Sequence, residues 1–414
     1  MISLAFTIAP LLFSSSASAH PLLGRSSGVK SQQNFTWPPT VKSVEILGNA
    51  TDNTVNRDSC GTTRIFDRVL WVCRDTQPNV APGHSQLYPV YSSSASWANF
   101  HLDGTPSTTL YGGDHAYTAY YPYAADECPP AGPMVSQCPA TGSCPGPLNL
   151  EGLCSDREKR YALWPDSPPL ASSEEGWPGL EITAYTWIKK SFIGLDLTTY
   201  VDDPATSLYK VTYNQLTWDQ NNLPETQLVD EEFWQQNAFP YGAYGNIVKD
   251  GTAYLLAQTS TRLVALARVP AHSMDKKSDY EFYVNGSWTD EMPGLNDTGV
   301  SIQNISAGGQ GTYFFSYFWN KFVWIGQASP SVTADFFITV ADKMEGPWEA
   351  PYHFYSGING DYFLSAYSLL AHPALSPGGK VVNNEVYISY TKNDVGFGTN
   401  IYTQPLIKVT WGSG

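Results

Sequence analysis

Short runs in which apolar and aromatic residues alternate with polar ones, or follow one another without a break, recur along the chain and end in turns. Representative runs are VKSVEILGN, RVLWVCRD, SLYKVTYNQLTW, GTYFFSYFWNKFVWIGQA and EVYISYTKND. The segments between paired runs, such as Lys249-Asp250-Gly251 and Asn285-Gly286, have the residues of tight turns. No stretch has a strong helical period. Many short strands without intervening helices predict a β-sandwich, a β-barrel or a β-propeller.

The spacing of the aromatic hairpins favours the propeller. They start near residues 65, 183, 245, 312 and 365, and after the first interval they are about 50 to 65 residues apart, near the upper end of known propeller periods. We therefore expect an all-β, five-bladed β-propeller as a single domain over residues 41–414, with a Cys/Pro/Gly-rich insertion at about 124–180. A strand at 41–47 should pair with LIKVTW near the C-terminus and close the ring, which hides both sheet edges. Residues 20–40 should form an N-terminal tail.

The charge content narrows the range of partners. Only 15% of the residues are Asp, Glu, Lys or Arg, against about 25% in a typical soluble domain. The net charge is −15. Nucleic acids and anionic membranes need a basic face, so we expect neither as a partner. No stretch after the N-terminal segment is long and apolar enough for a membrane helix, and we expect a monomer.

The N-terminus has the pattern of a secretory signal peptide. An apolar run is followed by small residues and by Ala17-Ser18-Ala19, so residues 1–19 should be removed by cleavage before His20. Five Asn-x-Ser/Thr sequons support export, because their asparagines accept N-glycans. The five are Asn34, Asn49, Asn285, Asn296 and Asn304. We therefore expect a secreted, extracellular glycoprotein.

The cysteines indicate disulfide bonds. All six lie between residues 60 and 154, and an even number in an exported chain is typical of a disulfide framework. Cys60 and Cys73 lie at opposite ends of one predicted hairpin and form the first expected pair. The other four lie in a Pro/Gly-rich stretch without apolar periodicity: Cys128, Cys138, Cys144 and Cys154. No Cys-x-x-Cys spacing supports a zinc site instead.

Several segments, taken in order, resemble a known family. The stretch RDSCGTTRIFDRVLWVCRDT over residues 57–76 resembles the first blade of the propeller family catalogued as domain of unknown function 4185. LVALARVPAHSMDKKSDYEFYVNGSW, DFFITVADKMEGPWEAP and YSLLAHPALSPGG resemble its later blades. The resemblance covers roughly residues 44–411, and it departs from the family pattern in the cysteine-rich insertion and at Arg74, where glycine is usual. It implies a five-bladed propeller, and some bacterial members of the family resemble endo-D-arabinanases and other furanosidase propellers.

Three carboxyl groups are candidates for catalysis. Glycoside hydrolysis needs two of them, one on each side of the scissile bond, and the ends of inner strands meet at one mouth of a propeller. Asp58 lies at the turn into the first strand, and Asp75 closes that hairpin. Glu181 starts the second blade among apolar neighbours that would raise its pKa, so it is the expected proton donor. Asp58 would be the base or nucleophile, and Asp75 with Arg74 would fix the substrate. The alternatives are a purely structural Arg-Asp pairing for Asp58 and Asp75, and a solvent-facing strand position for Glu181.

Candidate substrate-binding residues come from segments rich in aromatic residues and glycine. Arg74 would hold a neighbouring carboxylate ionised. Asp114 and His115 in YGGDHAYTAYYPY would contact sugar hydroxyls. Tyr244 in FPYGAYGN would contribute to a sugar platform, and His372 in LAHPAL is a further candidate. Each candidate has a competing interpretation: a plain loop histidine for His115, aromatic core packing for the FPYGAYGN segment, and a satisfied core histidine for His372.

We expect no cofactor and no catalytic metal. A structural calcium ion at carboxylate runs such as Asp202-Asp203 or Asp230-Glu231-Glu232 is left open, although such runs are more often solvated faces. No Gly-x-Ser-x-Gly elbow, phosphate-binding loop or His-Glu-x-x-His motif is present. The sequence favours a secreted glycoside hydrolase acting on a furanose-containing or related polysaccharide. The alternatives are a non-catalytic carbohydrate-binding or cell-wall propeller and a secreted interaction protein.

Overall fold

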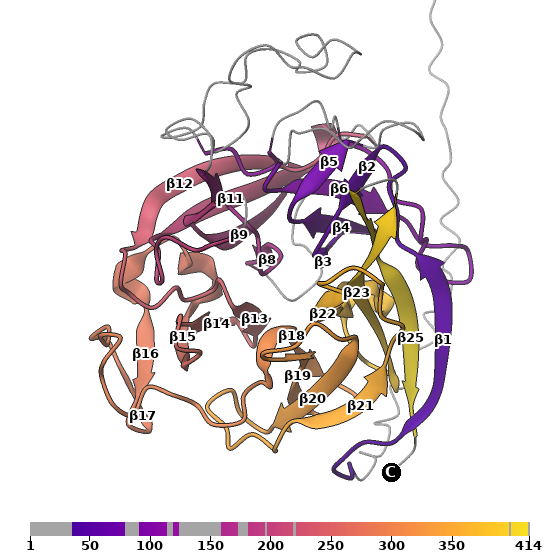
Figure 1. Cartoon of the computed structure of the whole chain (residues 1–414). Coiled ribbons are helices and arrows are strands. Elements are labelled where there is room, and N and C mark those ends of the chain that lie inside the picture. Colours follow the sequence, from indigo (N-terminus) through magenta and orange to yellow (C-terminus); the bar gives the residue numbers. More distant parts are fainter. Residues whose placement is uncertain are drawn as a thin grey trace, which may run out of the picture. The chain divides into compact units, whose positions relative to one another are not determined.

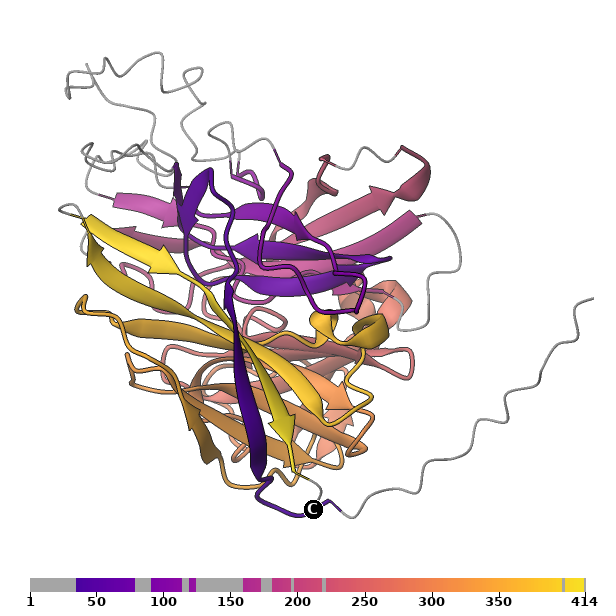
Figure 2. The same ribbon diagram turned by 90° about the vertical axis from the view of Figure 1, so that its right-hand side faces the viewer.

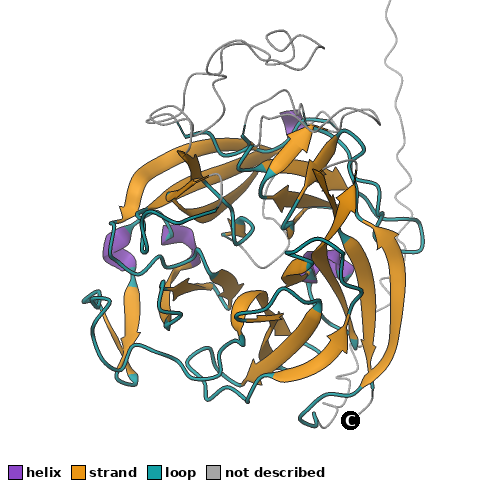
Figure 3. Ribbon diagram, viewed as in Figure 1, coloured by secondary structure: helices purple, strands orange, loops and turns teal. Residues whose placement is uncertain are grey.

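Successive segments of the chain form five antiparallel sheets, which stand around a common axis as blades (Figure 1). The computed structural model describes residues 35–78, 91–113, 119–123, 159–172, 181–194, 197–217, 221–396 and 399–412, which belong to one unit, Gln33–Gly414. Within these residues the helical pieces are short 3-10 turns in the connections, such as Pro373–Leu375 (Figure 3). The expected all-β, five-bladed propeller is confirmed.

The blades follow the order of the chain, and the first strand of each lies nearest the central channel. Blade I contains β3 (Gly61–Ile65), β4 (Arg68–Cys73) and β6 (Ser94–Ala98). Blade II contains β8 (Leu170–Ala171), β9 (Glu181–Lys189), β11 (Thr206–Asn214) and β12 (Glu225–Trp234). Blade III contains β13 (Gly245–Lys249), β14 (Thr252–Gln258), β15 (Val264–Pro270), β16 (Glu281–Val284) and β17 (Ser287–Thr289). Blade IV contains β18 (Gly308–Ser316), β19 (Lys321–Ala328), β20 (Asp335–Ala341) and β21 (Tyr352–Ser356).

Blade V combines strands from both ends of the described chain. Its C-terminal strands are β22 (Ala366–Ala371), β23 (Glu385–Gly396) and β25 (Pro405–Trp411), with β24 (Thr399–Thr403) beside β23. The N-terminal strand β1 (Val41–Asn49) pairs antiparallel with β25, with Val44 opposite Val409 (Figure 2). The predicted closing strand is thus confirmed. Two short pairs stand beside the blades: β2 (Val55–Arg57) with β5 (Thr76–Pro78), and β7 (Lys159–Ala162) with β10 (Ser191–Gly194).

Hydrophobic clusters fill the gaps between neighbouring blades. Leu70 of blade I shares a cluster with Tyr209 of blade II, and Leu256 of blade III shares one with Trp324 of blade IV. Because a blade buries both of its faces against neighbours, a strand such as β4 is buried at every position. This explains why RVLWVC is apolar at consecutive positions rather than strictly alternating.

Gly242, between blades II and III, packs against Trp187 of blade II. Its φ is +90°, and a β-carbon there would lie 2.5 Å from the ring of Trp187. Only glycine combines that backbone conformation with so little space. The glycine in the FPYGAYGN segment therefore serves packing between the blades.

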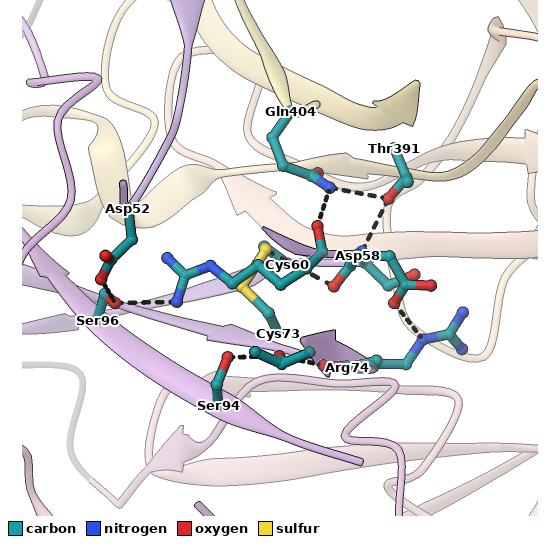
Figure 4. The surroundings of a disulfide bond; sticks show 12 residues. Asp52, Asp58, Cys60, Cys73, Arg74, Ser94, Ser96, Thr391 and Gln404 are labelled. Atoms are coloured by element: carbon teal, nitrogen blue, oxygen red, sulfur yellow. Dashed lines mark hydrogen bonds and ion pairs between the residues drawn. A yellow bond between two sulfur atoms is a disulfide. The ribbon is translucent and has the colours of Figure 1, made fainter. Parts of the chain in front are cut away.

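A disulfide joins Cys60 and Cys73, as the hairpin predicted (Figure 4). The bond links the residue before β3 to the last residue of β4, and both cysteines are fully buried. Several other predictions fall outside the described residues, namely the signal peptide at 1–19, Asn34, Asp114, His115, Cys128, Cys138, Cys144 and Cys154.

No helix in the described ranges is long and apolar enough to cross a bilayer. Nor do the described residues bring three or more His, Cys, Asp or Glu side chains together as a metal site would. The acidic run at the end of β12 pairs with lysines: Asp230 with Lys277, and Glu231 and Glu232 with Lys190.

Candidate active site at the proximal mouth

The inner strands of the blades begin at the same end of the central channel. Ser59, just before β3, bonds Ser368 in β22, with 2.6 Å between the hydroxyl oxygens. Tyr244, just before β13, donates its hydroxyl to a carbonyl at the start of β18 at 2.6 Å. Gln310 in β18 donates its amide to Asp166, which precedes β8. These contacts define the end of the channel that we call the proximal mouth.

Asp58 and Arg74 meet at this mouth from the two ends of one hairpin (Figure 4). The backbone N–H of Arg74 donates to the carbonyl of Asp58 at 3.0 Å. The Nε of Arg74 lies 3.9 Å from Oδ1 of Asp58, and Tyr367 donates its hydroxyl to Oδ2 at 2.7 Å. The two charged side chains are only 14% and 10% exposed, so their interaction is less screened than it would be in water.

Asp166 is the other carboxylate that Arg74 reaches, and sequence reasoning missed it. Nη1 of Arg74 lies 2.7 Å from Oδ1 of Asp166, and Nζ of Lys189 lies 3.1 Å from Oδ2. Gln310 adds a hydrogen bond to Oδ1 at 3.1 Å. Burial alone would raise the pKa of Asp166, but Lys189 and Arg74 outweigh it and lower the pKa below its ordinary value. Asp166 is therefore held as a carboxylate with both oxygens engaged.

Asp58 has the opposite electrostatic setting. Burial is the main cause that raises its pKa, to about 6, and the charge of Asp75 adds to the rise. Arg74 and the hydrogen bond from Tyr367 act in the other direction without cancelling it. One guanidinium group thus lies between a carboxyl that titrates near pH 6 and one that stays ionised well below that pH. Pairs of carboxyl groups whose environments push their pKa values apart are typical of acid–base sites.

Asp75 lies next to this pair, although its side chain turns elsewhere. Its Oδ1 accepts a hydrogen bond from Nε1 of Trp164 at 2.7 Å, and its backbone carbonyl accepts one from the N–H of Asp58 at 3.1 Å. Trp164 also lies under the guanidinium of Arg74, 5.2 Å from Cζ to the ring centroid. Asp75 therefore fixes Trp164 and influences Asp58 through its charge.

Glu181 does not lie at the proximal mouth, so the predicted grouping of Glu181 with Asp58 is wrong. Glu181 begins β9, whereas Lys189 ends that strand and reaches Asp166. The eight steps of extended chain between residues 181 and 189 correspond to about 26 Å. The side chain of Glu181 is exposed, so the expected apolar setting is also wrong. Ile182 and Trp187 are buried in the core, whereas Glu181 points out.

His372 lies in the core and not on an accessible surface. It is fully buried, with Nε2 2.6 Å from the hydroxyl of Ser389 and Nδ1 3.0 Å from that of Thr62. Burial lowers its pKa to about 3, so the ring is neutral. Because both nitrogens have protein partners, the prediction that His372 contacts a sugar is wrong, and the competing interpretation as a satisfied core histidine describes it.

Tyr244 lines a pocket of about 290 Å³ at the proximal mouth. Its walls include the charged cluster described above, with Arg74, Trp164, Asp166, Lys189 and Gln310. Asp202, Asp203 and Ser260 form part of the rim on the side of blades II and III. Asp203 accepts hydrogen bonds from the N–H and the hydroxyl of Ser260 at 2.8 and 2.7 Å.

The charges of this pocket are nearly balanced. Arg74 and Lys189 both bind Asp166, so neither cation is left to attract an acidic ligand. Asp202 is exposed, and its side chain forms no hydrogen bond or ion pair within the described residues. The pocket therefore offers aromatic surface, a titrating carboxyl nearby and one open carboxylate, a set of groups suited to a neutral polar ligand.

The fold and this pocket define a five-bladed propeller with a carboxylate site at one end of its channel. No family model matches the chain, and no curated protein matches it. Among solved structures, it is similar to a protein of Bacteroides ovatus classed provisionally as a hydrolase. That similarity has a TM-score of 0.57 at 16% identity and covers 88% of this chain and 87% of the other.

Two carbohydrate-active enzymes match with lower scores. An α-L-arabinanase of Cellvibrio cellulosa, solved with arabinohexaose, has a TM-score of 0.41 at 11% identity, with 85% of this chain and 90% of that chain covered. An exo-β-1,3-galactanase of Phanerochaete chrysosporium has a TM-score of 0.41 at 10% identity, and the match covers 88% of this chain and 64% of that chain. At 16% identity, the similarity to the Bacteroides ovatus protein shows the propeller fold and nothing finer.

Proposed function

We propose that the chain is a secreted glycoside hydrolase acting on a neutral, furanose-containing or related polysaccharide. The observation that carries the proposal is the placement of Arg74 between Asp58 and Asp166, with opposite pKa shifts on the two carboxyl groups. The resemblance of the sequence motifs to endo-D-arabinanase-like propellers supports the furanose.

Asp58 is the proposed base or nucleophile. A group with a pKa near 6 can take up and release a proton close to the pH at which an extracellular enzyme works. The hydroxyl of Tyr367 donates to Oδ2 and orients the carboxylate. Asp166 has a positioning role, because both of its oxygens already bind cations, and its negative charge keeps Arg74 and Lys189 in place.

Asp202 takes over the proposed role of proton donor in place of Glu181. It lines the proximal pocket, it is exposed, and it has no side-chain partner within the described chain. Asp203 is less suited, because Ser260 occupies both of its oxygens. Two carboxyl groups with different surroundings are the usual requirement for glycoside hydrolysis.

The four described sequon asparagines are compatible with an exported glycoprotein. Asn49, Asn285, Asn296 and Asn304 are all exposed, as an attached glycan requires. Cleavage before His20 and occupancy of these sites belong to the same proposal. N-terminal sequencing and mass analysis of the exported protein before and after enzymatic deglycosylation test both.

A non-catalytic carbohydrate-binding propeller is the second candidate, and one observation favours it. No glutamate lines the described proximal pocket, and Glu181 lies at the other end of blade II. Reducing-sugar release over a panel of arabinans, galactans and xylans separates the two. The hydrolase releases sugar from at least one member, whereas the binding propeller retains a polysaccharide on a glycan array without turnover.

A further inference from the structure

A separate and larger cavity lies at the other end of the channel, which we call the distal mouth. The inner strands end there, and the cavity has a volume of about 410 Å³. It reaches from beneath Asp166 to a rim formed by Arg64 near the end of β3, Phe66 after β3, Tyr317 after β18 and Lys380 after β22. Tyr317 is 38% exposed, so the rim reaches the surface. The proposed hydrolase uses none of these rim residues.

The walls of this distal cavity present almost no free hydrogen-bonding groups. Between the rim and the proximal end, every polar side chain along it except Tyr313 has a protein partner, and the set comprises Thr62, Thr63, Asp166, Ser167, Asn246, Thr312 and Tyr313. Thr63, for example, donates its hydroxyl to a backbone carbonyl at 2.7 Å. The remaining wall is formed by residues such as Ile247, Phe314, Phe315, Leu370 and Val381. A sugar would lose its hydrogen bonds to water here without replacement.

The rim, in contrast, carries two cations with different surroundings. Nζ of Lys380 lies 5.4 Å from the ring centroid of Tyr317, and no described carboxylate lies within ion-pair distance of it. Arg64 donates Nε to the carbonyl of Phe66 at 2.8 Å and Nη1 to that of Ala374 at 3.4 Å, and its Cζ lies 4.3 Å from the ring centroid of Phe100. Burial lowers the pKa of Arg64, although Asp67 partly compensates.

The two cations are neighbours in space. Gly379 precedes Lys380, and a β-carbon at Gly379 would lie 3.1 Å from Cβ and from Cγ of Arg64. The stem of Arg64 therefore packs against the backbone that carries Lys380.

We propose that the distal cavity binds a small amphipathic carboxylate, with its apolar body in the channel and its carboxylate at Lys380. The volume is within the range of small-molecule sites, which is about 300–1,000 Å³. Apolar burial supplies the main affinity, and Lys380 selects for the charged head group over a neutral one. The two pockets have Asp166 in common, but the distal cavity has its own rim and its own ligand chemistry, so the proposed binding does not rest on the hydrolase activity.

Isothermal titration with octanoate and with octanol tests the proposal on the full-length exported protein. Wild type should bind octanoate about 3- to 10-fold more tightly than octanol at low salt. Lys380→Gln should remove most of that preference and leave octanol binding unchanged. The Nζ of Lys380 has no anionic partner in the described chain, so this variant should fold; circular dichroism confirms that it does.

Lys276→Gln is the matched control, because Lys276 is exposed and does not line the cavity. It removes the same charge and should bind octanoate as wild type does. Absence of octanoate binding, equal affinity for octanoate and octanol in wild type, or an equal loss in both lysine variants would each overturn the proposal.

Discussion

Arg74 and Asp166 lie 92 residues apart in the sequence, and their side chains form an ion pair in which Nη1 is 2.7 Å from Oδ1. Arg74 follows β4 of blade I, and Asp166 precedes β8 of blade II. The same guanidinium group has its Nε 3.9 Å from Asp58. One cation therefore connects two blades and sets the electrostatic environment of two carboxyl groups.

Replacing Arg74 with glutamine should destabilise the protein strongly. Asp166 and Asp58 would remain buried with less compensation, and breaking a buried ion pair from one side costs about 3–5 kcal/mol. Urea denaturation at neutral pH measures the change in the free energy of unfolding. Lys277→Gln is the control, because it breaks the exposed pair with Asp230 and should cost less than about 1 kcal/mol. Equal losses in the two variants would contradict the proposed network.

The pH dependence of stability should identify Asp58 as the group with the raised pKa. Its folded pKa of about 6 lies above the ordinary value of 3.8, so the folded protein binds this proton more tightly than the unfolded chain. The resulting stabilisation is fully present below pH 3.8 and is lost as the pH rises through 6. Asp58→Asn removes this dependence. Between about pH 4 and about pH 7, the stability of wild type relative to the variant should fall by up to about 3 kcal/mol.

Denaturation of the two proteins at several pH values provides the measurement. Asp166 contributes the opposite dependence, because its lowered pKa gives stability that is lost as the pH falls. It is present in both proteins, so it largely cancels in the difference. A difference that is flat with pH, or that grows with rising pH, would rule out a raised pKa for Asp58.

The disulfide between Cys60 and Cys73 should contribute a moderate part of the stability. It closes a loop with a sequence separation of 13, for which loss of the bond costs about 2–4 kcal/mol. Cys60→Ala/Cys73→Ala, unfolded in urea beside wild type, tests this. Alkylation of unreduced wild type should leave both cysteines unmodified, and labelling of either one would show that the pair is not formed.

The fold could be predicted because its signals are local and repeated. Aromatic hairpins near 245 and 312 correspond to the inner strand pairs β13–β14 and β18–β19. The sequence pattern predicts that the strand beginning at Val41 pairs near Trp411, and it does. The pairing of Cys60 with Cys73 is predicted correctly because a hairpin fixes which residues lie opposite one another. None of these inferences needs the relative placement of distant blades.

The site was predictable only in part, because it depends on how distant blades are placed relative to one another. Asp58 and Arg74 belong to one hairpin, and sequence reasoning brings them together. Asp166 lies in WPDSPP, within the predicted insertion, and the strand it precedes has only two residues, Leu170–Ala171, too short to show a periodic pattern. The prediction misplaces Glu181 because β9 is the second strand of blade II and runs antiparallel to β8. Its beginning therefore lies at the distal end of the channel.

The effect of Asp202→Asn on two substrates with different leaving groups tests whether Asp202 is the proton donor. Loss of a general acid slows release of a poor leaving group such as a sugar by about 10²–10⁴-fold. A nitrophenyl furanoside needs little protonation, so its hydrolysis should change much less. Asp203→Asn is the control for the loop. Asp203 accepts a hydrogen bond from Ser260, so this variant should change the rates of hydrolysis of both substrates equally. Equal effects of Asp202→Asn on both substrates would remove Asp202 from this role.

The central claim is that Asp58 performs the chemistry, and the turnover of Asp58→Asn tests it most directly. Asparagine keeps the size of the side chain and removes its charge. Asp250→Asn is the control, because Asp250 is exposed in the turn between β13 and β14. The measurement is kcat/KM for the polysaccharide that wild type hydrolyses. We predict a fall of about 10²–10⁴-fold for Asp58→Asn and no change for Asp250→Asn, with the fold of both variants intact by circular dichroism. Activity of Asp58→Asn within about twofold of wild type, far below the effect of losing a general base, would contradict the account.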